Sequence, residues 1–280
     1  MERRRGERLR RPGRRPDQDE ARGRRPLNLR LDLAYHGAPF HGFARQRDVR
    51  TVQGDAEDAL EQLLGVPVRT SAAGRTDTGV HALGQVINAP HAPDDLDLDK
   101  IRDAFNSMCG PHLAATSCTA APADFDARFS ALSRTYVYAI LNRPVPDPFA
   151  AGTSLFHPGP LDLDAMNEAC GHLVGPHDFI SFGRVSEPGA PSERNLYELR
   201  CTERGGFVSV VARANAFIQQ MVRSVVGTLV QVGEGRRSPD EMPGVLEARD
   251  RAAAGPVAPP HGLCLLTVEY GSGWSGPSAV

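Results

Sequence analysis

The sequence has no hydrophobic run of about 18 residues, which is the length that a membrane-spanning helix needs. Its basic N-terminus is not followed by the apolar stretch of a secretory signal. Its five cysteines are widely spaced and form neither a CxxC motif nor a cluster with histidine. We therefore expect a cytoplasmic protein with no membrane span, no disulfide framework and no metal site.

Lysine is almost absent, since Lys100 is the only one among the 32 lysines and arginines. Nearly all positive charge is therefore guanidinium, whose planar fork binds phosphate groups and stacks on bases. A codon bias toward arginine in a GC-rich genome is the alternative explanation. Residues 1–26 hold 11 arginines and 5 acidic residues, a net of +6, so the formal total of −2 leaves −8 for residues 27–280. The N-terminal segment thus favours a nucleic-acid partner, whereas the net charge of the remainder argues against one.

The composition is that of a globular protein with a substantial core, because 40% of the 280 residues are hydrophobic and 24% are charged. Residues 1–26 have too few apolar side chains to fold, and they predict a disordered arm. Two interpretations of this arm stay open, an RNA-gripping extension and an extended or misannotated start. The remaining pattern indicates one α+β half at 27–130, a second at 131–272 and a flexible tail at 273–280.

The first half predicts the element order β-α-β-β-α-β. Residues 27–33 alternate strictly between leucine and other residues, which is typical of a strand with one buried face. Thr51 is suited to cap a helix, and Gly65 stands where a left-handed C-terminal cap is expected. The other predicted elements are strands at 66–73, 80–89 and 113–119 and a helix at 98–108. This order is that of a split βαβ, or ferredoxin-like, unit.

The second half repeats the order less regularly. The helix at 217–232 has the strongest pattern, because apolar pairs recur every four residues. The other predicted elements are a strand at 135–141, a helix from Leu163 to Gly175, a hairpin of strands at 196–202 and 207–213, a helix to about Arg249 opened by a capping box at Ser238–Glu241, and a strand at 263–270. We therefore predict an α+β protein in which two ferredoxin-like halves pack on one extended, mostly antiparallel sheet.

The densest polar segment between two predicted strands is Gly74–His81, with the sequence GRTDTGVH. Its glycines permit a tight backbone and the close approach of a large ligand. The neighbouring Arg75 favours the ionised form of Asp77, which suits a nucleophile or base better than a general acid. Because Asp and Thr beside Gly are also common turn formers, a plain hairpin turn is the alternative.

The segment Ala73–Val86, AGRTDTGVHALGQV, resembles the active-site motif of TruA-type pseudouridine synthases, in which the aspartate is the catalytic residue. Further blocks resemble that family's pattern in the same order and spacing, from about residue 29 to residue 270. They are Tyr35–Gly37, Thr51–Gln53, Phe125–Ala131, Arg134–Tyr138, His177–Phe179, Asn215–Phe217, Met221–Arg223 and Gly262–Leu263. The resemblance therefore covers nearly the whole predicted folded chain and implies the pseudouridine synthase fold.

The resemblance implies roles for five side chains. Asp77 would act on the target uridine, Tyr136 would lie against the flipped uracil, and Arg223 would pair with the aspartate and orient it. Arg75 would bind RNA phosphates or displace the neighbouring base pair as the target base flips. Leu263 would form an apolar wall of the pocket that holds the base. The implied reaction breaks the N-glycosidic bond, rotates the freed uracil and rejoins it through carbon, and it needs no metal or redox cofactor.

The family acts on uridines 38, 39 and 40 of the tRNA anticodon stem-loop, as a homodimer whose subunits share each tRNA. The resemblance thus implies tRNA and a second copy of the chain as partners. Phe43-Ala44 stands where the family usually has Trp-Gln, and Thr78 stands where it has Ala, so the modified position is less secure than the reaction type. The alternatives are a related synthase with another tRNA or RNA position, a noncatalytic RNA-binding protein on the same fold, and a hydrolase that uses Asp77 with His81.

Overall fold

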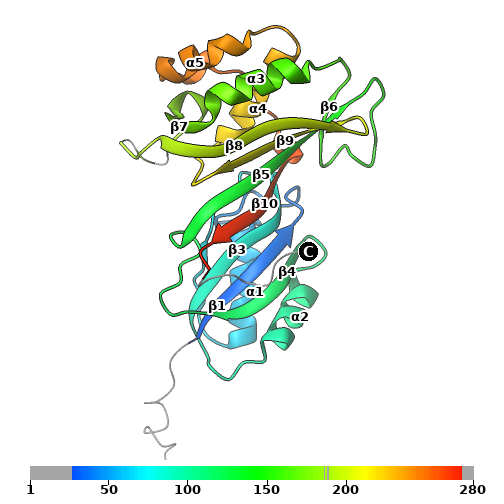
Figure 1. Cartoon of the computed structure of the whole chain (residues 1–280). Helices are drawn as coiled ribbons and strands as arrows, with labels where there is room; N and C mark the ends of the chain where they lie inside the picture. The colour runs from blue at the N-terminus through cyan, green and yellow to red at the C-terminus, as the bar shows by residue number, and fades with distance from the viewer. Residues whose placement is uncertain (1–26, 186, 188, 273–280) are drawn as a thin grey trace, which may run out of the picture.

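The computed structural model describes residues 27–185, 187 and 189–272, so the predicted arm at 1–26 and tail at 273–280 lie outside the described residues. The molecule is elongated and built on one long twisted sheet (Figure 1). The first half comprises β1 (Leu27–Tyr35), α1 (Val52–Leu64), β2 (Ser71–Ala72), β3 (His81–Ala92), α2 (Leu98–Cys109) and β4 (Leu113–Ala121). The second comprises β5 (Ala131–Asn142), β6 (Leu155–His157), α3 (Leu163–Leu173), β7 (Gly175–Asp178), β8 (Glu193–Arg204), β9 (Phe207–Ala214), α4 (Met221–Gly233), α5 (Met242–Ala248) and β10 (Leu263–Tyr270). Within the described part, no helix has the length and apolar character needed to cross a membrane.

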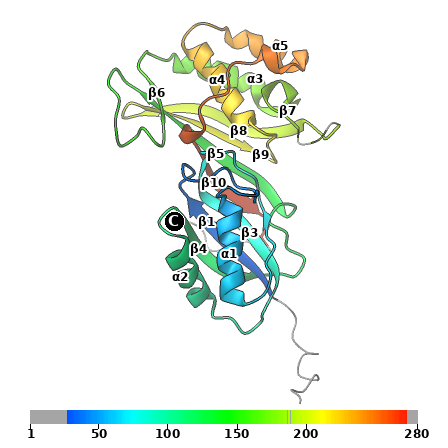
Figure 2. The same cartoon turned by 180° about the vertical axis from the view of Figure 1, so that it is seen from behind.

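The two halves have the same strand order. The sheet runs β4-β1-β3-β10-β5-β9-β8-β7, and β2 pairs with β3. The first half therefore reads β4-β1-β3-β2, and β10-β5-β9-β8 occupy the corresponding places in the second. Neighbours within each set are antiparallel. In the first half α1 lies behind the sheet in Figure 1 and in front of it in Figure 2. This arrangement confirms two ferredoxin-like halves on one mostly antiparallel sheet.

The halves are joined by β10, which pairs in parallel with β3. The strand that we predicted at 66–73 is shortened to the two residues of β2. The reason is that the backbone N–H groups of Val68 and Thr70 bond to the carboxylates of Glu61 and Glu57 on α1, at 3.1 and 2.9 Å. Side chains that bond to the backbone in this way compete with a strand ladder. The short β2 leaves part of the β3 edge open, and β10 occupies it.

The prediction that β1 buries one face is wrong. Leu29, Leu31 and Leu33 are fully buried on one side, but Arg30 and Asn28 on the other side are buried as well. The segment after β4 covers this second side. Asn28 donates to the carbonyl oxygen of Phe125 at 2.8 Å, and the Arg30 guanidinium lies 5.7 Å from the centre of the Phe125 ring. The alternating leucines of β1 identified its core face, but they gave no signal that the segment after β4 would cover the opposite face.

Helix α4 begins at Met221, four residues later than the pattern predicted. Gln220 has a left-handed backbone with a φ of 65°, and Gln219 exchanges two backbone hydrogen bonds with Arg184 instead of extending the helix. Phe217 packs edge-on against Tyr136. The apolar repeat before Met221 therefore reflects burial against the sheet and not helical continuity. The capping box at Ser238–Glu241 is confirmed, with a 3-10 turn leading into α5.

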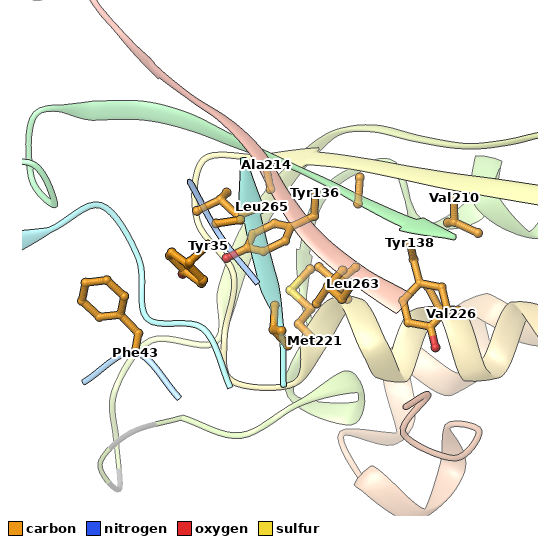
Figure 3. Close-up of a cluster of buried hydrophobic side chains, with 14 of the residues drawn as sticks. Tyr35, Phe43, Tyr136, Tyr138, Val210, Ala214, Met221, Val226, Leu263 and Leu265 are labelled. Carbon is orange, nitrogen blue, oxygen red and sulfur yellow. The ribbon is translucent and has the colours of Figure 1, made fainter. Parts of the chain in front are cut away.

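A single cluster of buried side chains extends through both halves, from the leucines of β1 to the apolar face of α4. Its centre is shown in Figure 3, where Tyr136 lies between Tyr35 on one side and Met221 and Leu263 on the other. The core is therefore continuous across the junction of the two half-sheets. The loop before β3 and helix α4 therefore pack against the same core.

The segment of residues 254–262, which ends in a 3-10 turn at Pro260–Gly262, packs across α4 and leads into β10. Gly227 allows the close approach, because a Cβ atom there would overlap the carbonyl oxygen of Pro256. The N–H of Gly255 donates to the Thr228 hydroxyl at 2.9 Å. The segment and α4 thus form one rigid unit.

We expect Gly227→Ala to lower the free energy of unfolding by about 1–3 kcal/mol, the usual cost of forcing extra atoms into a packed region. The matched control is Gly171→Ala on α3, where a Cβ atom meets nothing within 4 Å. Better helix propensity predicts that this control gains about 0.5–1 kcal/mol. Chemical denaturation measures both changes. Equal effects of the two substitutions would contradict the packing role of Gly227.

Candidate active site

Asp77 lies in the loop between β2 and β3 and forms an ion pair with Arg223 of α4. The distance from Arg223 Nη1 to Asp77 Oδ2 is 2.9 Å. Both side chains are shielded, with exposed fractions of 13% for Arg223 and 23% for Asp77. A shielded pair is screened by salt less than an exposed one. Because the loop belongs to the first half and α4 to the second, the pair connects the two halves of the molecule.

Arg223 is itself held by the segment that packs across α4. Its Nε donates to the carbonyl oxygen of Ala258 at 2.7 Å, and the N–H of Ala258 donates to the carbonyl oxygen of Arg223 at 3.0 Å. The guanidinium is therefore fixed from two directions. Among the described residues, Arg223 Nη2 and Asp77 Oδ1 have no hydrogen-bond partner. The arrangement orients the carboxylate and leaves one of its oxygens available.

The start of the loop is anchored by Arg134 of β5. Its Nε and Nη2 donate to the carbonyl oxygen of Ala73 at 3.1 and 2.8 Å. Its other bonds go to the carbonyl oxygens of Arg128, Ala131 and Asn215. Burial lowers the pKa of Arg134 from its usual value. Because its hydrogen-bond partners among the described residues are all backbone carbonyls, this cation serves to hold chain segments in place.

The middle of the loop is bound to the core through Thr76. Its carbonyl oxygen accepts the N–H of Phe43 at 3.0 Å, and its hydroxyl lies 2.9 Å from the Tyr35 hydroxyl. Burial raises the pKa of Tyr35 to about 12, so this hydroxyl stays protonated. Gly42 has a φ of 91°, in the left-handed region that favours glycine, and a Cβ atom there would lie 3.3 Å from the Thr76 carbonyl oxygen. The loop is thus a rigid platform and not a plain hairpin turn.

Tyr136 supplies a buried aromatic ring beside this loop. Its ring packs edge-on against Phe217, with centroids 5.2 Å apart at 89°. Its hydroxyl faces Gly74, where a Cβ atom would lie 3.8 Å away. Burial raises the pKa of Tyr136 well above its usual value. Figure 3 shows Tyr136 and Leu263 in the same cluster, and Leu263 is buried.

Arg75 and His81 flank Asp77 in sequence, but neither bonds to it. Arg75 is exposed and has no hydrogen bond or ion pair within the described ranges. His81 is buried, and its ring nitrogens lie at 3.0–3.1 Å from backbone atoms of Gly37, Gly152 and His261. The structure therefore offers no Asp77–His81 pair for the hydrolase that the sequence left open.

The structure brings together four of the five predicted site residues. Asp77, Arg223, Tyr136 and Leu263 surround the junction between the loop and α4, whereas Arg75 points to solvent. Sequence reasoning assigned no role to Arg134, although it lies at an even spacing from Tyr136 and Tyr138 on the buried face of its strand. A charged residue at a core-facing position is the signal that could have identified it. The described residues contain no group of three or more His, Cys, Asp or Glu side chains arranged to hold a metal ion.

Comparison with known proteins agrees with the motif. A family model described as tRNA pseudouridine synthase matches residues 33–130 and 169–271. The tRNA pseudouridine synthase A of Paramagnetospirillum magneticum is 45% identical over 253 residues, which cover 89% of this chain and 98% of that protein. The proteins of the same name from Frankia casuarinae and Mesorhizobium japonicum are 46% and 43% identical, over 87% and 86% of this chain and 89% and 98% of theirs.

Among solved structures, a chain from the "Crystal Structure of a Cbf5-Nop10-Gar1 Complex" aligns with a TM-score of 0.33 at 12% identity, covering 72% of this chain and 45% of that one. This likeness is too weak to support an argument. The family match and the relatives span most of the chain and include the loop that holds Asp77. The chain belongs to the tRNA pseudouridine synthase A family.

Proposed function

We propose that this protein is an isomerase that converts uridine to pseudouridine in tRNA, with Asp77 as its catalytic carboxylate. The observation that carries the proposal is the ion pair of Asp77 with Arg223 at 2.9 Å, beside the buried Tyr136. The pair fixes Asp77 Oδ2 and leaves Oδ1 free to react. Membership of the tRNA pseudouridine synthase A family supports the choice of reaction and of tRNA as substrate.

The chemistry fits these groups. The bond between N1 of uracil and C1′ of ribose breaks, the base rotates, and a bond from C5 to C1′ forms. The C5 proton is lost and N1 gains a proton, so atoms and electrons balance without an oxidant or reductant. An ionised carboxylate can act on the nucleoside, and an aromatic ring replaces the stacking that the extruded base loses. The neutral phenol of Tyr136 suits contact with an uncharged base.

The remaining residues have subsidiary roles in the proposal. Arg75 is exposed and has no partner among the residues that the structure describes, which suits contact with RNA phosphates or displacement of the neighbouring pair as the base flips. Leu263 gives the pocket an apolar wall. We further propose that the targets are uridines 38, 39 and 40 of the anticodon stem-loop, and that the protein acts in the cytoplasm as a homodimer. A related synthase that modifies another position is the second candidate, because residues 43, 44 and 78 depart from the family pattern.

Asp77→Asn keeps the shape of the side chain and removes its charge. We expect it to abolish pseudouridine formation and to change tRNA affinity little, because the carboxylate is the reacting group. The measurement is mapping of pseudouridines in unmodified tRNA after incubation with each protein, and Asp103→Asn on the exposed side of α2 is the matched control. Formation at about a tenth of the normal rate or more would rule out Asp77 as the essential group.

The same mapping tests the substrate. Pseudouridine at positions 38, 39 or 40 supports the full proposal, and pseudouridine elsewhere identifies the related synthase. Wild-type protein and the Asp103→Asn control are assayed on the same transcript, so that their results can be compared directly. Absence of pseudouridine with both proteins contradicts the proposed function.

Tyr136→Phe retains the ring, whereas Tyr136→Leu removes it. Stacking of a base on an aromatic ring is worth about 1–3 kcal/mol, so we expect the leucine variant to lose most of the turnover rate and the phenylalanine variant to keep more of it. Thermal denaturation separates this role from that of an ordinary core tyrosine. A large fall in melting temperature with intact turnover would show that Tyr136 only fills the core.

Arg223→Lys tests the fixed guanidinium. A lysine can keep a charge near Asp77, but its single nitrogen cannot occupy the places of both Nη1 at Asp77 and Nε at the carbonyl oxygen of Ala258. We expect kcat to fall by about tenfold with a small change in melting temperature, because the carboxylate loses its fixed orientation. Arg102→Lys on α2, which is also ion-paired, is the control. Equal kcat values for the two variants would show that charge alone suffices at Arg223.

A further inference from the structure

We propose that His81 is a positioning residue of the active site, which in its neutral form ties the end of the Asp77 loop to the segment that holds Arg223. This inference rests on the proposed function, because it names what positions that same site. His81 is the first residue of β3, directly after the loop and four residues after Asp77. Its side chain is buried, and its hydrogen bonds within the described residues all involve backbone atoms.

The hydrogen bonds select one tautomer of His81. The backbone N–H of Gly37 can only donate, so Nδ1, at 3.0 Å, accepts and carries no hydrogen. The hydrogen is therefore on Nε2, which lies 3.1 Å from the carbonyl oxygens of both Gly152 and His261. A neutral imidazole with its hydrogen on Nε2 accepts from Gly37 and shares its one N–H between the two carbonyl oxygens.

Two of the three partners, Gly37 and His261, belong to segments that touch the Asp77 loop. Gly37 lies against Val80, whose carbonyl oxygen a Cβ atom at Gly37 would overlap. Gly79 lies against Pro260, where a Cβ atom would be 3.1 Å from Pro260 Cγ. The Gly152 loop comes from the second half, between β5 and β6. His81 thus joins three segments around one end of the loop.

These contacts form a closed cycle of interactions that includes the ion pair of Asp77 with Arg223. Asp77 bonds to Arg223, and Arg223 Nε bonds to the carbonyl oxygen of Ala258. Three residues further on, the carbonyl oxygen of His261 bonds to His81, which is four residues from Asp77. The position of the Arg223 anchor relative to the loop is therefore set partly by His81. A displacement of about 1 Å at such a site can cost about 100-fold in rate.

Protonation of His81 breaks its contact with Gly37. A hydrogen on Nδ1 would face the N–H of Gly37, leaving two donors against each other. The titratable groups that act on His81 are His36 of the loop after β1, with ring centroids 4.5 Å apart, and His261 of the turn before β10. The Gly152 loop contributes a backbone carbonyl. Burial, followed by the proximity of His36, lowers the pKa of His81 below the ordinary 6.5. The neutral form therefore holds at neutral pH, and the contact with Gly37 is lost as the pH falls through the lowered pKa.

Three substitutions separate the contact of His81 with Gly37 from its contacts with Gly152 and His261. In His81→Gln, the amide nitrogen can replace Nε2 as the donor to the second-half carbonyls, but the side chain has no acceptor at the position of Nδ1, where Gly37 donates. In His81→Asn, the shorter amide can accept from Gly37 but does not reach the other partners, and His81→Leu does neither. We expect the leucine variant to lose roughly 10- to 100-fold in kcat with KM for tRNA nearly unchanged. The glutamine variant should recover more of kcat than the asparagine variant.

The pH profile of kcat distinguishes positioning from mere stability. We expect the acid limb of the wild-type profile to move to lower pH in His81→Gln, because an amide does not titrate. His172→Gln, which replaces a half-exposed histidine on α3, should keep the wild-type profile. Superimposable profiles of wild type and His81→Gln, or equal kcat for the glutamine and leucine variants, would overturn the proposal.

Hydrogen exchange of the unliganded proteins, followed by mass spectrometry, gives a readout that does not depend on activity. We expect His81→Leu to exchange faster in residues 36–43, 147–154 and 258–262, and His81→Gln to exchange faster only in 36–43. Unchanged exchange in His81→Leu overturns the positioning role. If the exchange pattern is as expected but wild-type protein forms no pseudouridine, the proposed function fails and the structural role of His81 stands.

Discussion

The structure depends on the short parallel contact at which β10 joins β3. Its register pairs, Cys264 with His81 and Leu265 with Ala82, lie directly after the Asp77 loop. The contact is possible because β2 is short, and β2 is short because the carboxylates of α1 bind the preceding backbone. The half-sheets therefore fuse where the loop ends, and α4 of the second half faces the aspartate of the first. A site whose members come from both halves exists only while the halves are docked.

The Asp77 loop has almost no strand ladder of its own, so its backbone groups need other partners. They find them in side chains that project from regular elements: Arg134 from β5 and Gln85 from β3, which donates to the carbonyl oxygen of Gly74 at 2.8 Å. Placing these anchors on strands gives the loop the rigidity of the sheet. A preorganised site requires such support, because a carboxylate that acts on one atom of a large ligand must be held in a fixed position. The cost is a buried guanidinium, and its four carbonyl partners offset part of that cost.

Sequence pattern predicted the regular elements well where local signals act alone. Thr51 and Gly65 cap α1 as expected, with Thr51 accepting from Gly54 and Gly65 at a φ of 69°. Sequence pattern failed where long-range contacts determine the backbone conformation. One case is residues 66–70, whose backbone binds the carboxylates of α1, and the other is Gln220, where the predicted helix does not continue. In the site, the GRTD segment located Asp77, but its partner lies 146 residues away, and only the resemblance to a known family linked the two. His81 and Arg134 bind backbone atoms. Because every residue has a backbone carbonyl, the identity of their partners leaves no motif in the sequence.

The net charge of −8 over residues 27–280 argued against RNA, and the structure shows why that sum misleads. Many surface arginines are already matched to acids, such as Arg50 with Asp55 and Arg102 with Asp99, each at 2.8 Å. Their charges cancel locally, and at physiological salt any remaining field fades beyond about 8 Å. Arg75 differs, because it stands exposed beside Asp77 and has no acid partner in the described part of the chain. In the role proposed for Arg75, an RNA phosphate that approaches the loop would respond to this nearby unpaired charge more than to the distant carboxylates that make the total negative.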